Sequence, residues 1–95
     1  MTIGALKMTL LLHGCFSLKE KRRCVRPVLA KVREKFHVAA AEVAHQDAHG
    51  VAEVAFVTVS SNGRIANATC DKIIDFVESL GLVEVGATEM ELINW

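Results

Sequence analysis

Residues 3–36 read IGALKMTLLLHGCFSLKEKRRCVRPVLAKVREKF, and their pattern predicts a strand, a turn and a helix. At the start of this segment every second side chain is apolar, which is the period of a strand with one buried face. The alternating residues are Leu6, Met8, Leu10 and Leu12. We therefore predict a strand over Ile3–His13 that ends at Gly14, because glycine commonly interrupts regular structure.

A helix is predicted directly after this turn. Ser17 is followed three residues later by Glu20, the spacing of a capping box that satisfies free amide groups at a helix start. The next apolar residues share one side of a helical projection and are expected to be buried: Leu18, Val25, Leu29, Val32 and Phe36. Pro27 lies inside this pattern and removes a backbone hydrogen bond, so we predict a bend or two shorter helices.

Two further strands and a second helix follow. The strands are predicted at His37–Ala44 and Val51–Ser60, and the six residues between them suit an antiparallel hairpin. The second helix is predicted to start after a cap at Ser61 or Asn62 and to stop at Gly81. Its apolar positions are spaced by four and three residues: Ala66, Cys70, Ile73, Val77 and Leu80.

A last strand is predicted over Leu82–Leu92, with Ile93–Trp95 as a short tail. The element order is therefore βαββαβ, which predicts a ferredoxin-like α+β fold: a four-stranded antiparallel sheet with two helices on one face. We expect one domain over residues 1–95, because these elements use the whole sequence. The uncovered face would expose Ile3, Ala5 and Leu11, so a homodimer that covers it is expected.

The composition limits the class of protein. The chain has 95 residues, 52% of them hydrophobic, no net charge and a mean hydropathy of +0.32, which predicts a folded chain and not a disordered one. It has no secretory signal and no apolar run long enough for a membrane span, so we expect a cytoplasmic protein without membrane contact. The cysteines Cys15, Cys24 and Cys70 are odd in number and form no CxxC pair, which favours three reduced thiols.

The charges are strongly divided along the chain. Residues 1–37 hold nine Lys and Arg against two acidic residues, and residues 38–95 hold two against nine. The first helix carries a basic strip beside its apolar stripe: Lys19, Arg22, Arg23, Arg26 and Arg33. Such a strip is suited to the phosphates of RNA or of a ribosomal particle. Two alternatives stay open: a module that binds an acidic protein through its open sheet face or edge, and two helices whose opposite charges serve only solubility.

A weaker alternative is a metal site. The expected topology brings the end of the first strand near the hairpin, and four potential ligands lie there: His13, His45, Asp47 and His49. No nucleophile elbow, phosphate-binding glycine loop or nucleotide fingerprint occurs in the sequence. We therefore expect a protein that is not an enzyme and needs no cofactor.

Three short segments resemble a known family. Ser17–Arg22 (SLKEKR) after the first strand, followed by Ala41–Val43 (AEV) and His45–Asp47 (HQD), is similar to the YlxP-like family of bacterial domains of unknown function. The resemblance extends from Ile3 to about Leu92 and implies a ferredoxin-like fold. Its members are often encoded beside translation and ribosome-maturation genes, which implies a role near RNA. The chain departs from the family after Asp47, where it lacks the usual tryptophan and arginine.

Overall fold

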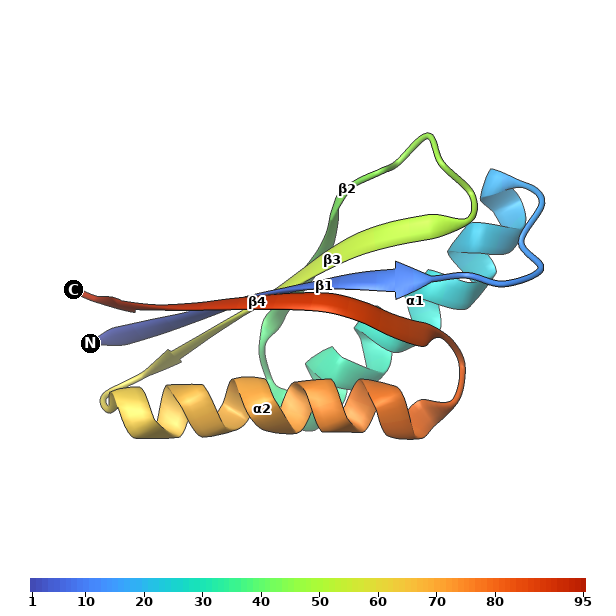
Figure 1. The fold of residues 1–95 in the computed structure, drawn as a ribbon. Helices are drawn as coiled ribbons and strands as arrows, with labels where there is room; N and C mark the ends of the chain where they lie inside the picture. The colour runs from blue at the N-terminus through green and yellow to red at the C-terminus, as the bar shows by residue number, and fades with distance from the viewer.

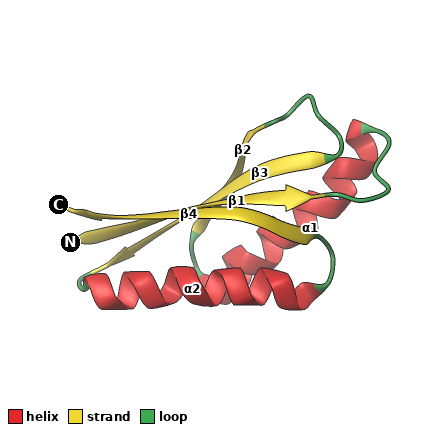
Figure 2. Cartoon of the chain, viewed as in Figure 1, coloured by secondary structure: helices red, strands yellow, loops and turns green.

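The computed structural model describes residues 1–95 and contains the six elements in the predicted order. The strands are β1 (Thr2–Leu11), β2 (Ala39–Ala44), β3 (Val51–Ser60) and β4 (Glu84–Asn94). The helices are α1 (Leu18–Phe36) and α2 (Gly63–Leu80). The strands form one antiparallel sheet in the order β2-β3-β1-β4, and both helices cover the same face (Figure 1, Figure 2). The ferredoxin-like α+β fold is thus confirmed.

The hydrophobic core lies between the sheet and the helices. Leu6, Met8 and Leu10 of β1 are completely buried, as their alternation predicts, and Phe56 of β3 packs into the same cluster. The helix α2 contacts β1, β3 and β4, whereas α1 contacts β2 and α2. The helices therefore divide the covered face between them, and α1 lies over the hairpin side. Neither helix is long and apolar enough to cross a membrane.

The predicted cap at the start of α1 is present. The Ser17 hydroxyl accepts a hydrogen bond from the Glu20 amide at 3.2 Å, and the Glu20 carboxylate accepts one from the Phe16 amide at 2.9 Å. At its other end, α1 stops at His37, which has a left-handed backbone (φ 54°). The backbone amide of His37 donates a hydrogen bond to the Arg33 carbonyl. The strand β2 consequently begins at Ala39 and not at His37, because His37 ends the helix.

Two details predicted for α1 are wrong: its division into two helices and the burial of Leu18. The helix is continuous over 19 residues, so Pro27 does not divide it into two; proline removes one hydrogen bond, and buried neighbours on the same helix keep the remaining turns packed. The buried side is also rotated: Leu18 is 36% exposed, whereas Lys21 and Val28 are buried. Contact with the β2–β3 hairpin brings Lys21 inward, as described below.

The ends of β4 and β1 differ from the prediction. The strand β4 spans Glu84–Asn94 and therefore includes two residues of the expected tail. Long-range pairing holds them: Asn94 lies opposite Thr2, and the Trp95 amide donates to the Met1 carbonyl at 2.8 Å. β1 ends at Leu11, two residues before its predicted end. In each case, pairing with a strand distant in the sequence sets where the strand ends. The local alternation of apolar and polar residues does not show this pairing.

The sheet face opposite the helices is largely apolar. Ile3 of β1 lies between Val59 of β3 and Ile93 of β4, and the latter two are 63% and 41% exposed. At the middle of the face, Lys7 lies 3.8 Å from a carboxylate oxygen of Glu53 and 3.9 Å from one of Glu89. The face therefore combines an apolar end with a central cluster of charges.

Candidate functional site

Four cations gather on the outer side of α1, turned away from its buried side. They are Lys19, Arg22, Arg23 and Arg26, and with Pro27 they line an open depression of about 360 Å³. All four are exposed, and none of them forms an ion pair with a carboxylate. Their spacing of three and four residues repeats the helical turn, which aligns them along one side. We call these four residues the basic face.

Arg33, the fifth predicted member of the strip, is engaged elsewhere. Its guanidinium donates a hydrogen bond of 2.6 Å to the carbonyl of Ala40 at the start of β2. This contact joins the last turn of α1 to the edge strand and turns the side chain toward the sheet. Arg33 does not line the depression, so the structure groups four of the five predicted residues.

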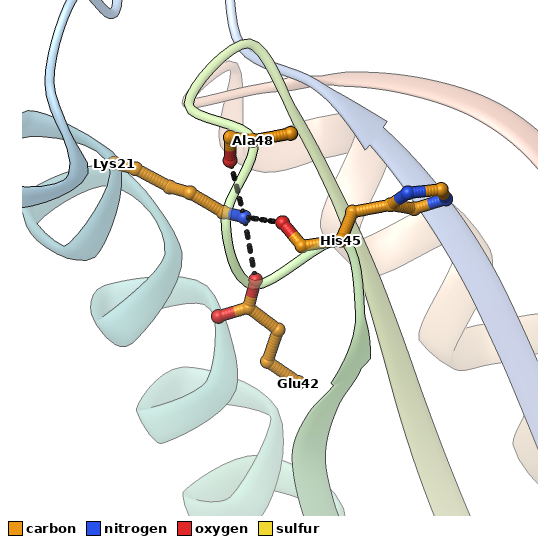
Figure 3. A network of polar contacts seen from close by, with 4 residues as sticks. All are labelled: Lys21, Glu42, His45 and Ala48. Carbon is orange, nitrogen blue, oxygen red and sulfur yellow. Dashed lines mark hydrogen bonds and ion pairs between the residues drawn. The ribbon is translucent and has the colours of Figure 1, made fainter.

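Lys21 has a different role from its basic neighbours. It is only 2% exposed, and its ammonium donates to the carbonyls of His45 at 2.6 Å and Ala48 at 2.7 Å. A carboxylate oxygen of Glu42 lies 2.7 Å from the same nitrogen (Figure 3). That oxygen is buried and has no polar partner other than the Lys21 ammonium, whose charge compensates for its loss of water. The ammonium therefore contacts three oxygen atoms, one from the Glu42 carboxylate and two from backbone carbonyls, and replaces water that they lose on folding.

The Lys21 network fastens α1 to the β2–β3 hairpin. Lys21 belongs to the segment Ser17–Arg22, and its partners Glu42 and His45 belong to the two other segments that resemble the YlxP-like family. No role for Lys21 was predicted from the sequence. A signal was present in the sequence: Lys21 lies three residues after Leu18 and four before Val25, a position where an amphipathic helix turns inward.

The predicted metal ligands are not assembled into one site. His13 pairs with Glu84 at the start of β4, and His49 donates from Nδ1 to the Cys15 carbonyl at 3.0 Å. His45 adopts a left-handed backbone (φ 63°) and serves the Lys21 network through its carbonyl. No three His, Cys, Asp or Glu side chains are arranged to hold a metal ion. These histidines instead connect the loops at this end of the sheet.

The cysteines are free thiols with two different surroundings. A hydrogen bond with Cys24 raises the pKa of Cys15, and burial adds to the effect. Burial likewise raises the pKa of Cys70, which lies on the buried side of α2, and the charge of Asp71 adds to it. Both thiols are therefore held in the neutral form more strongly than exposed cysteines.

The sequence matches a family model across nearly its whole length. The model is described as "Protein of unknown function (DUF503)" and covers residues 3–90. The chain belongs to the DUF503 family. This DUF503 chain is also 27% identical over 89 residues to the "Uncharacterized protein YlxP" of Bacillus subtilis (strain 168), which covers 94% of this chain and 97% of that protein. The resemblance to the YlxP-like family is thereby confirmed, and neither description states an activity.

A solved structure with a similar backbone supports the fold of this DUF503 member. The structure described as "Structural Genomics, protein YJCS" has a TM-score of 0.54 at 12% identity and covers 97% of this chain and 99% of its own. A second structure is a mutant of SnoaB, a cofactor-independent oxygenase from Streptomyces nogalater, and it is also 12% identical. Its TM-score is 0.48, and the match covers 99% of this chain and 92% of that chain. At 12% identity, the first structure shows the fold alone.

Proposed function

We propose that this protein binds structured RNA or a ribosomal particle through the basic face of α1, and that it acts by binding and not by catalysis. The observation that carries the proposal is the set of four exposed cations that share one depression without an acidic partner. Cations that are not paired within the chain are free to replace the counterions of a phosphate backbone. The RNA phosphates would supply the missing negative charge.

The chemistry of the basic face favours phosphate. Three of its four members are arginines, whose planar guanidinium groups donate two parallel hydrogen bonds to one phosphate. Side chains three or four residues apart on a helix lie about 5–6 Å from each other, so neighbouring members can contact one backbone together. We therefore expect binding that depends on salt and on the shape of the RNA more than on its sequence.

Aromatic side chains contribute little to this surface. Phe16, which comes directly before the helix cap, is 79% exposed and is the aromatic residue next to the basic face in the sequence. The single aromatic residue of β1 and β3 is Phe56, and it is buried. A sheet-based platform that stacks successive bases is thus missing. This supports contact with phosphates as the main source of affinity, with one ring available for an unpaired base.

A charge-reversal experiment tests the proposal. The variant carries Arg22→Glu, Arg23→Glu and Arg26→Glu, and the matched control carries Lys31→Glu, Arg64→Glu and Lys72→Glu. The control residues are equally exposed and unpaired, so both variants change the net charge by the same amount. Circular dichroism first checks that both variants fold. Binding is then followed by co-sedimentation with ribosomal particles and by fluorescence anisotropy of a structured RNA over a salt series.

We expect the basic-face variant to lose salt-sensitive binding and the control to keep most of it. The slope of log K against log salt should be shallower by about two to three for the variant, because about three phosphate contacts are lost. Equal loss in both variants would mean that only net charge matters, and the proposal would fail. Co-sedimentation that resists nuclease and persists in the basic-face variant would favour an acidic protein partner instead.

We also propose that the open sheet face binds a second copy of the chain. The row of Val59, Ile3 and Ile93 is more apolar than a solvent-facing sheet usually is, which supports this proposal. The central Lys7 and Glu89 are 50% and 76% exposed in their side chains, so each has room for a reciprocal partner across a two-fold axis. The basic face stays free in such a dimer, because the helices cover the opposite side of the sheet.

Sedimentation velocity over a range of protein concentrations tests the dimer. Val59→Glu should shift the chain toward the monomer, because it places charge in the apolar row. Ile65→Glu is the matched control, since Ile65 is 56% exposed but lies on α2, on the other side of the sheet. A chain that is monomeric at every concentration, or equal dissociation by both substitutions, would contradict this interface.

A further inference from the structure

Two thiols from separate parts of the fold are in contact. Cys15 lies in the turn between β1 and α1, and Cys24 lies in α1; their Sγ atoms are 3.5 Å apart. Cys15 is 8% exposed and Cys24 is partly buried. They are nine residues apart and form no CxxC motif, so only the folded chain brings the two sulfur atoms together. The third thiol, Cys70, lies on the buried side of α2.

The surrounding structure holds both residues in place. The Cys15 carbonyl accepts a hydrogen bond from His49 of the hairpin loop at 3.0 Å. Ser17 and Glu20, which lie between the two cysteines, form the cap that fixes the beginning of α1. A disulfide bond is about 2.05 Å long, so bond formation needs a further approach of the sulfurs. Cys15 is in a turn outside the sheet and the helices, which is where such an adjustment disturbs the least regular structure.

We propose that Cys15 and Cys24 form a redox-active dithiol that exchanges with small disulfides such as oxidised glutathione. The more exposed Cys24 thiolate attacks one glutathione sulfur, the glutathione S–S bond breaks, and the first glutathione thiolate leaves. Cys15 then loses its proton to solvent, and its thiolate attacks Cys24 Sγ. The mixed disulfide breaks, the Cys15–Cys24 bond forms and the second glutathione leaves. Two electrons pass from the protein thiols to glutathione disulfide, which becomes two glutathione molecules.

The surroundings of Cys15 indicate that thiol–disulfide exchange at this pair is slow. The hydrogen bond with Cys24 and burial raise the pKa of Cys15, and the negative charge of Glu20 acts in the same direction. A thiol that stays protonated attacks rarely, so the second step should limit the rate and should speed up at higher pH. The pair is therefore a site that responds to sustained oxidation. This inference does not depend on RNA binding.

Oxidation of the intact, folded chain tests the proposal. The reduced protein is incubated with oxidised glutathione, the remaining thiols are alkylated, and intact mass and peptide mapping identify the products. We expect the number of free thiols to fall from three to one, with a loss of two hydrogens in mass and full reversal by dithiothreitol. The linked peptides should contain Cys15 and Cys24, and Cys70 should remain free.

Single substitutions separate the two steps. Cys15→Ser should stop the reaction at a glutathione adduct on Cys24, because the second thiol is missing. Cys70→Ala is the matched control and should form the same disulfide as the unsubstituted chain. If Cys15→Ser does not fold, Cys24→Ser serves instead, and it should form no internal disulfide. Three free thiols after prolonged incubation, disulfides between chains, or oxidation of Cys70 at the same rate would each overturn the proposal.

Discussion

The Lys21 ammonium lies 2.7 Å from the Glu42 carboxylate, with the lysine almost completely buried between α1 and the β2–β3 hairpin. Two backbone carbonyls of the hairpin loop complete its surroundings, so one side chain connects three parts of that hairpin to the helix. A buried ion pair costs desolvation energy, which the additional hydrogen bonds offset here. We infer that the network fixes the position of the hairpin more than it adds net stability.

The first prediction concerns the loss of this lysine. Lys21→Ala leaves the buried Glu42 oxygen and the Ala48 carbonyl without a partner and removes one of the two donors to the His45 carbonyl, so we expect the free energy of unfolding to fall by about 3 kcal/mol. Urea denaturation measures the change. Lys19→Ala, two residues away and exposed, should change it by less than about 0.5 kcal/mol. Similar effects of both substitutions would contradict the structural role of Lys21.

The second prediction concerns the close approach of α2 to β1 at Gly4. A Cβ atom at this position would lie 3.0 Å from Thr58 Cγ2 and 3.3 Å from Cys70 Sγ. Gly4→Val should therefore lower the free energy of unfolding by about 1–3 kcal/mol through overpacking. Gly50→Ala provides the control, because no heavy atom lies within 4 Å of the added Cβ. If Gly4→Val did not lower stability in thermal unfolding, α2 would be able to move away from β1 at little energetic cost, contrary to this prediction.

The third prediction concerns Pro27 in the continuous helix α1. Pro27→Ala supplies an amide that can donate to the Arg23 carbonyl, so we expect a gain of about 1–3 kcal/mol in the free energy of unfolding. Removing proline also makes the unfolded chain more flexible, which stabilises the unfolded state. The gain in the free energy of unfolding is therefore smaller than the full cost of proline inside a helix. Pro27→Gly restores the same amide but should gain about 1 kcal/mol less. Destabilisation by Pro27→Ala in urea denaturation would contradict this interpretation.

The fourth prediction concerns alkaline pH. Burial raises the pKa of Cys70 above its ordinary value of 9.0 in the folded chain, so folding favours the neutral thiol. This contribution to stability is complete below the unfolded pKa and is lost as pH rises through the folded pKa. We expect the free energy of unfolding to fall as pH rises above about 9, and to fall less in Cys70→Ala. Identical pH profiles for the two chains would exclude this contribution.

Local patterns predicted much of the architecture. The alternation from Leu6 to Leu12 and the pairing of Ser17 with Glu20 each depend on neighbours a few residues away, so the sequence expresses them directly. The positions of Val51–Ser60 and the stop at Gly81 follow from the same kind of signal. The exposed cations of the basic face were also readable, because helical spacing alone puts them on one side.

Other features depend on contacts between distant segments. The sequence places Lys21 toward the buried side of the helix but does not show the partners of Lys21 or Arg33, because these partners lie in β2 and the hairpin loop. The end of β4 is set by pairing with Thr2 at the start of the chain, and the two thiols meet only after α1 docks. Thus the sequence by itself determined the order and the type of the elements, through local periodicity and caps. Only the tertiary structure decided which charges are buried and which sulfurs touch, because burial and proximity arise when distant segments pack together.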